Sequence, residues 1–133
     1  MAFKICESLD TNIILRLMLR DVPEQCLKIQ DLFMRQGVTY HVADLAITEA
    51  VYVLQRYYDR RDIVDMLSGI FELGDLNYNR NLFERVFPMY LNCPKLSFND
   101  CCLGGYAALN EVEPLWTFDK ALAKESGTAK MLG

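Results

Sequence analysis

A short polar segment, Asp10-Thr11-Asn12, lies between two apolar stretches and constrains the fold more than any other part of the sequence. Residues 3–9 before it form a mostly apolar segment that we expect to be extended, and residues 13–19 after it are strongly apolar. A lone carboxylate in apolar surroundings is costly unless it is paired, hydrogen-bonded or bound to a metal. Functional side chains of open α/β sheets gather beyond the carboxyl ends of strands, where we place Asp10. The alternative is a turn or helix N-cap, with Thr11 and Asn12 supplying turn hydrogen bonds.

Length and composition predict one globular domain over residues 1–133. A chain of 133 residues can bury roughly two-thirds of its unfolded surface without disulfides. Hydrophobic residues at 52% and charged residues at 24% are typical of a globular protein rather than a disordered one. The net charge of -4 argues against a protein that binds nucleic acid through a positive charge over its whole surface. It is compatible with nucleic-acid binding by basic residues confined to one rim.

We expect a soluble, cytoplasmic protein without membrane attachment. The first residues lack the apolar core of a signal peptide, and no stretch approaches the ~18 uninterrupted apolar residues that span a membrane. The five cysteines show no CxxC pair or metal-binding spacing, which fits free thiols in a reducing compartment.

Apolar spacing and helix-end residues predict the elements after the first strand. Asp21, Asp59 or Asp62, and Ser97 are expected helix caps, and Gly37 is an expected helix stop. Residues 73–81 read as turn-like, with a weak strand at Leu76 and Tyr78 as the alternative. The predicted helices cover residues 21–36, 44–58, 59–71, 80–90 and 97–109, and the predicted strands cover residues 38–42, 113–119 and 129–132.

Three further carboxylates resemble Asp10 in position. Glu49 interrupts a helix that is apolar almost all round, so we expect it on a buried stripe, unless it pairs with an arginine or reaches outward. Asp100 lies at the head of an apolar helix, where a first-turn acid is also favoured by the helix dipole. Asp119 ends a short strand, as Asp10 does. Four such acids are hard to assign to separate capping roles, so we expect them to share a site.

Crowded carboxylates repel one another unless cations neutralise them. Ligands that are all oxygen select Mg²⁺ or Mn²⁺ over zinc. The single histidine, His41, argues against mechanisms that need two imidazoles and is most simply a strand residue. No GxSxG motif or Gly-rich phosphate loop is present. The acids therefore predict an oxygen-ligated metal site.

Five segments of the sequence, taken together, resemble one protein family. The segments that carry the resemblance are Asp-Thr-Asn-Ile-Ile-Leu-Arg at 10–16, Pro-Glu-Gln at 23–25, Thr-Glu-Ala-Val-Tyr-Val-Leu at 48–54, Phe-Asn-Asp at 98–100 and Thr-Phe-Asp-Lys at 117–120. Together and in this order they are similar to a PIN domain, and more narrowly to the ribonuclease toxin (VapC-type) of a bacterial type II toxin–antitoxin pair. The resemblance runs from Ile5 to Leu132.

The resemblance implies a three-layer α/β/α sandwich on a central, mostly parallel sheet. It places the family's acidic quartet on Asp10, Glu49, Asp100 and Asp119, with Thr11, Asn12 and Thr117 as supporting polar residues. We expect Asp10 and Asp100 to bind the metal directly, and Glu49 and Asp119 to bind through water, to bind a second metal or to orient water. Two departures stand out: Glu7 and Ser8 interrupt a strand that is buried in the family, and the third acid is followed by Cys101 and Cys102.

The implied activity is Mg²⁺- or Mn²⁺-dependent cleavage of RNA phosphodiester bonds, with the cation lowering the pKa of a bound water. Because an acidic pocket repels RNA, phosphate contacts must come from a basic rim. The candidates for that rim are Arg16, Arg20, Arg56, Arg60, Arg61, Lys120 and Lys124.

The expected partners are RNA, a cognate antitoxin protein and a second copy of the chain in a homodimer. Tyrosines and methionines such as Met18, Met34, Tyr57 and Tyr58 exceed what one small core absorbs, and these residue types are enriched at interfaces. An antitoxin could silence the enzyme by placing a basic side chain among the four carboxylates.

Two other functions remain open. One is an interaction module whose metal site is idle. The other is an aspartyl-phosphate receiver domain, which needs a central phosphoacceptor aspartate and a lysine on its last strand. Here the central acid is the helical Glu49, and Lys120 directly follows an aspartate, so the receiver is the weaker alternative.

Overall fold

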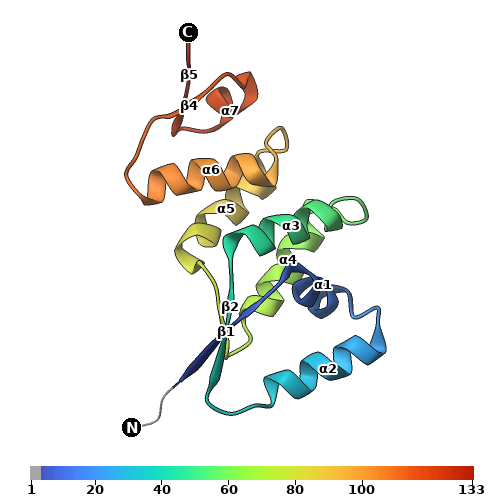
Figure 1. The fold of residues 1–133 in the computed structure, drawn as a ribbon. Coiled ribbons are helices and arrows are strands. Elements are labelled where there is room, and N and C mark those ends of the chain that lie inside the picture. The colour runs from blue at the N-terminus through green and yellow to red at the C-terminus, as the bar shows by residue number, and fades with distance from the viewer. Residues whose placement is uncertain (1–3) are drawn as a thin grey trace. The chain divides into compact units, whose positions relative to one another are not determined.

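The computed structural model describes residues 4–133, in two compact units, Met1–Asn79 and Arg80–Gly133 (Figure 1). Phe3, where the sequence predicted the first strand to begin, lies outside the described residues. Among the helices of residues 4–133, none is both long enough and apolar enough to cross a membrane.

The first unit contains a three-stranded parallel sheet. Strand β2 (Val38–Val42) lies between β1 (Ile5–Leu9) and β3 (Leu76–Asn77). Leu9 pairs with Val42, so β1 and β2 end side by side, and each strand then leads directly into a helix. The predicted α/β class, with a parallel sheet flanked by helices, is confirmed.

Four helices complete this unit: α1 (Thr11–Leu19), α2 (Pro23–Phe33), α3 (Asp44–Leu54) and α4 (Arg60–Phe71). Helix α1 packs against the other three (Figure 1). The sequence did not predict α1, because its apolar residues read as a continuation of the first strand. The helix forms because Asp10 caps it and because Ile14 and Leu15 are buried.

Several predicted helix ends need correction. Asp21 is not the N-cap of α2; it forms an ion pair with Arg16 at 2.7 Å, while Val22 precedes the helix. Helix α3 ends at Leu54 rather than at residue 58. The cap of α4 is Asp59, whose Oδ1 accepts from the Asp62 backbone N–H at 2.8 Å.

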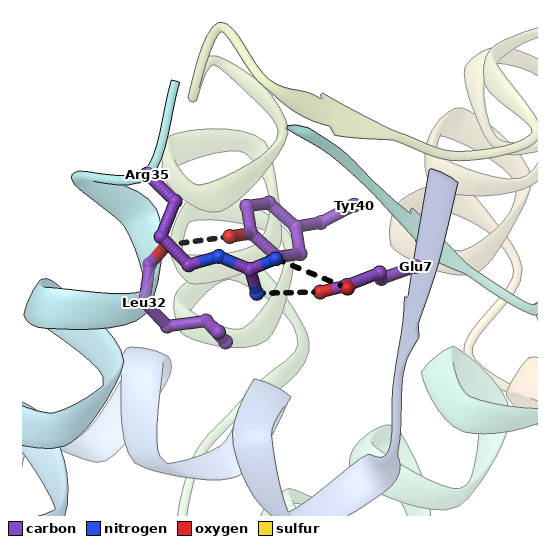
Figure 2. Close-up of polar contacts among 4 residues, drawn as sticks. All are labelled: Glu7, Leu32, Arg35 and Tyr40. Atoms are coloured by element: carbon purple, nitrogen blue, oxygen red, sulfur yellow. Dashed lines mark hydrogen bonds and ion pairs between the residues drawn. The ribbon is translucent and has the colours of Figure 1, made fainter. Parts of the chain in front are cut away.

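The polar residues within β1 have a structural explanation. Strand β1 is an edge strand, so only Leu9 of its five residues is buried. The Arg35 guanidinium holds the Glu7 carboxylate through two hydrogen bonds of 2.8 and 3.2 Å, which raises the pKa of Arg35 (Figure 2). The Tyr40 hydroxyl donates to the Leu32 carbonyl beside this pair (Figure 2). These contacts join the end of α2 to β1 and β2.

The second unit contains α5 (Arg80–Asn92), α6 (Phe98–Leu109), β4 (Leu115–Thr117), α7 (Lys120–Glu125) and β5 (Ala129–Met131). Helices α5 and α6 pack together around Phe98. The centre of its ring lies 5.1 Å from the ring centre of Tyr90 and 6.1 Å from that of Phe83. Strands β4 and β5 form a parallel pair and are shorter than the sequence predicted. Helix α7 was not predicted.

Two glycines let neighbouring segments approach α6 closely. A Cβ at Gly105 would lie 3.3 Å from side-chain atoms of Leu82 and Val86 on α5. A Cβ at Gly104 would lie 3.0 Å from Ser126 Oγ, an atom of a residue that is only 2% exposed. The turn that connects α7 to β5 therefore packs directly on the backbone of α6.

Candidate functional site

Asp10 lies at the carboxyl end of β1, as the sequence predicted, and it is also the N-cap of α1. Its Oδ1 accepts from the Ile13 backbone N–H at 3.2 Å. Within residues 4–133 no other hydrogen bond or ion pair involves its side chain, so Oδ2 remains available. The side chain is exposed. The capping alternative is therefore correct, and it occupies one of the two carboxylate oxygens.

Glu49 is not on a buried stripe, so that expectation was wrong. It is exposed, as are Leu45 at 68% and Tyr52 at 60% on the same face of α3. The buried face of α3 is formed instead by Ala46, Ile47, Ala50, Val51 and Leu54.

Glu49 nevertheless contacts the segment at the end of β1. The Thr11 hydroxyl donates to Glu49 Oε2 at 2.6 Å, across 38 residues of sequence. Such a short bond between a hydroxyl and a carboxylate is typical of a charge-assisted contact. Two of the predicted site residues therefore touch, and Asp10 is the direct neighbour of one of them.

Asp44 is an acid at the same edge that sequence reasoning missed. It lies two residues beyond the end of β2, in the first turn of α3, and its Oδ2 accepts from Asn79 Nδ2 at 3.1 Å. The signal was available, because Asp44 follows a predicted strand just as Asp10 does. Asp44 is half-buried and bonded to an amide, and as a first-turn acid it stabilises the start of α3.

Asp100 and Asp119, in the second unit, each serve the start of a helix. Asp100 Oδ2 accepts from the Ser97 backbone N–H at 3.1 Å, and Ser97 Oγ accepts from the Asp100 N–H at 3.0 Å, completing a capping box. Asp119 Oδ1 accepts from the Leu122 N–H at 3.0 Å, while Thr117 Oγ1 accepts from the Asp119 N–H at 2.9 Å. Each carboxylate again uses one oxygen.

The predicted site residues thus fall into two pairs, with Asp10 and Glu49 in Met1–Asn79 and Asp100 and Asp119 in Arg80–Gly133. Within each of these units, the described residues contain no group of three or more His, Cys, Asp or Glu arranged to hold a metal ion. The joining of the two pairs into one site stays a prediction.

The remaining polar residues have separate roles. His41 is an exposed residue of β2, as predicted, and its Nε2 lies 3.1 Å from Thr39 Oγ1. Of the expected basic rim, the Arg56 guanidinium lies 5.3 Å from the ring centre of Tyr52, and Arg16 is paired with Asp21. Sequence reasoning missed a further cation, Lys28, which lines a pocket together with Asp10.

No protein-family model matches this chain, and no curated protein matches it. Among solved structures, it is similar to VapBC2 from Rickettsia felis bound to a promoter DNA fragment, with 14% identity, a TM-score of 0.41 and coverage of 96% of this chain and 98% of that chain. A toxin–antitoxin complex from Klebsiella pneumoniae gives 15% identity and a TM-score of 0.35, with 96% of each chain covered.

A third similar structure is PAE2754 from Pyrobaculum aerophilum, with 18% identity, a TM-score of 0.32 and coverage of 98% of this chain and 90% of that chain. The chain is therefore similar, along nearly its whole length and at low sequence identity, to structures described as VapBC2 and as a toxin–antitoxin complex.

Proposed function

We propose that this protein is a metal-dependent endoribonuclease with a PIN-like site, and that it is the toxin of a toxin–antitoxin pair. The hydrogen bond from Thr11 to Glu49 carries the proposal. The sequence grouped these two residues through a family resemblance, although they are 38 positions apart. Their contact supports a site between the end of β1 and the exposed face of α3.

The chemistry of Asp10 and Glu49 fits Mg²⁺ or Mn²⁺. Each side chain is exposed, and each keeps one oxygen that no group in residues 4–133 hydrogen-bonds. Hard oxygen donors with open coordination positions suit these cations, which retain several waters when bound. In the proposed complete site, Asp100 and Asp119 add two further carboxylates. The bound cation supplies Lewis acidity toward water and phosphate oxygens.

The residues of this chain hold the carboxylates in place. The N-cap bond fixes the Asp10 side chain at the start of α1, and the Thr11 hydroxyl fixes the Glu49 carboxylate. A carboxylate that already accepts one hydrogen bond loses less rotamer freedom when it binds a cation, which is the advantage of preorganisation. Glu49 can also accept a proton from water through its second oxygen.

The direct test is an RNA cleavage assay with Mg²⁺, with Mn²⁺ and with a chelator. We expect cleavage with either cation and none with the chelator, while far-UV circular dichroism stays unchanged. Asp59→Asn is the matched control for Asp10→Asn, because Asp59 caps α4 through the same kind of bond as Asp10 caps α1. Cleavage that persists in chelator would overturn the metal mechanism.

The partner in the proposed pair is a small antitoxin protein, and self-association is proposed beside it. Met34 and Tyr57 are 74% and 76% exposed and Tyr58 is 40% exposed, which supports the expectation that these three lie outside the core, whereas Met18 is half-buried. Purification from the native host should yield a small bound protein, and light scattering should give a dimer. A monomer without a partner at high concentration would count against both associations.

A further inference from the structure

A pocket of about 400 Å³ lies directly beside Asp10, between α1 and α2. Its polar rim carries Asp10, Asn12, Gln25 and Lys28, and Ile29 and Leu32 lie among its apolar lining residues. Pockets of roughly 300–1,000 Å³ accommodate small organic ligands. A single nucleotide falls in this size class, and it has a charged phosphate and a flat, apolar-faced base.

Of the two basic side chains that line the pocket, one is free of an ion pair among the described residues and can bind an anionic ligand. Arg16 also lines the pocket, but it lies 2.7 Å from the carboxylate of Asp21. Lys28 is exposed, and within residues 4–133 no carboxylate lies within ion-pair distance of it. The Lys28 ammonium is therefore the group in this pocket that can bind a phosphate without first breaking an ion pair.

The other lining residues match the remaining parts of a nucleotide. The side-chain amides of Asn12 and Gln25 each offer a donor and an acceptor, which suits ribose hydroxyls and base edges. Among the apolar lining residues, Ile13 and Leu32 are half-buried and offer contact to the face of a base, whereas Ile29 is only 5% exposed. Sites for single-stranded nucleic acid combine a cationic groove for the backbone with aromatic side chains on which the bases stack. A pocket for a single base can use apolar side chains in place of aromatic ones.

We propose, resting on the nuclease function above, that this pocket binds one RNA nucleotide adjacent to the cleaved bond. Lys28 contacts its phosphate, and Asn12 and Gln25 hydrogen-bond its sugar or base. The base lies on Ile13 and Leu32. Because Asp10 lines the same pocket, the bound nucleotide lies next to the proposed cation. Lys28 is a positioning residue that places the RNA.

The experiment measures binding rather than cleavage. An unstructured, fluorescently labelled RNA of roughly ten nucleotides, in the size range of single-strand sites, is titrated with protein in chelator by anisotropy at several salt concentrations. Lys28→Ala should weaken binding several-fold and reduce the logarithmic salt slope by about 0.7, the value for one phosphate contact on a single strand. Lys28→Arg should restore the slope, because it keeps the charge.

Lys4→Ala is the matched control. Lys4 is an exposed lysine of the same unit that precedes β1, whereas Asp10 follows β1, so the two lie at opposite ends of the strand. It should leave both affinity and slope unchanged. If Lys28→Ala binds RNA as the wild type does, with the same slope, the pocket assignment is wrong while the nuclease proposal stands. If the wild type neither binds nor cleaves any RNA, both proposals fall.

Discussion

Asp10, Asp100 and Asp119 each cap or stabilise the start of a helix, and each does so with one carboxylate oxygen. The sequence treated helix capping and metal binding as alternatives. In the structure they are compatible, because a carboxylate has two oxygens and a cap occupies one of them. The cap also fixes where the second oxygen points, so local helix chemistry can prepare a ligand.

Substitutions at Asp10 should separate these two roles. Asp10→Asn should change the free energy of unfolding little, since asparagine is an equally good N-cap, yet it should reduce cleavage on the order of 100-fold through the lost charge. Asp10→Ala should lose the activity and also about 1 kcal/mol of stability. Urea unfolding and initial cleavage rates measure the two effects.

The matched substitutions at Asp59 complete this test. Asp59→Ala should lose a similar stability, because its Oδ1 makes the equivalent bond at α4, and it should retain activity. An Asp10→Asn protein that cleaves as fast as the wild type would remove Asp10 from the proposed metal site.

Thr11 should act by positioning Glu49. Thr11→Val removes the 2.6 Å hydrogen bond but keeps the side-chain shape, and we expect Mn²⁺ affinity to fall about 10-fold. Thr11→Ser should restore it. Thr48→Val is the control, because within residues 4–133 the Thr48 hydroxyl donates to the Leu45 carbonyl of its own helix and to no other group. Equal Mn²⁺ affinities for all three variants, measured by calorimetry, would show that Thr11 has no such role.

Residue patterns indicated Glu49 as a site residue, but for a reason that the structure corrects. An α3 that is apolar almost all round predicts burial on every side, whereas Leu45 and Tyr52 leave one face exposed. Hydrophobic periodicity cannot decide which of two apolar faces enters the core when both carry similar residues. The contact with Thr11 depends on how α1 packs against α3, which no local pattern contains.

At the scale of elements, the sequence predicted best where end signals were strong. Ser97 and Asp59 cap their helices as expected, because the side-chain oxygen of each accepts a hydrogen bond from a backbone N–H in the first turn of its helix. Helix α1 was missed because its apolar residues, broken only by Arg16, were taken as a continuation of the first strand. Helix α7 was missed because its six residues are too few to show a helical period.

The two glycine-to-alanine substitutions at Gly104 and Gly69 should have opposite signs. At Gly104 a Cβ meets Ser126 Oγ at 3.0 Å, so the alanine should destabilise the protein by about 1–3 kcal/mol through overpacking. At Gly69, in α4, a Cβ meets nothing within 4 Å, so the alanine should stabilise by roughly 0.5–1 kcal/mol. Thermal unfolding measures both, and a stabilising Gly104→Ala would contradict the close packing on α6.

At the scale of the whole molecule, the chain divides into two compact units, Met1–Asn79 and Arg80–Gly133. The sequence predicted a single domain and one site of four acids, but the acids divide equally between the units. Length and composition constrain the size of a core, not the number of units that share it. The family resemblance spans both units, and that is the reason to expect them to cooperate.

Unfolding with and without a cation tests both expectations together. Trp116 is the single tryptophan and lies on β4 of the second unit, so its fluorescence reports that unit, while far-UV circular dichroism reports the helices of both. One domain requires coincident transitions by the two probes. A shared site requires that Mg²⁺ at about 100 times its Kd raise the stability seen by Trp116 by about 2.7 kcal/mol. Asp10→Asn, in the first unit, should abolish that shift, and a shift that survives it would mean that the two pairs of acids do not share a cation.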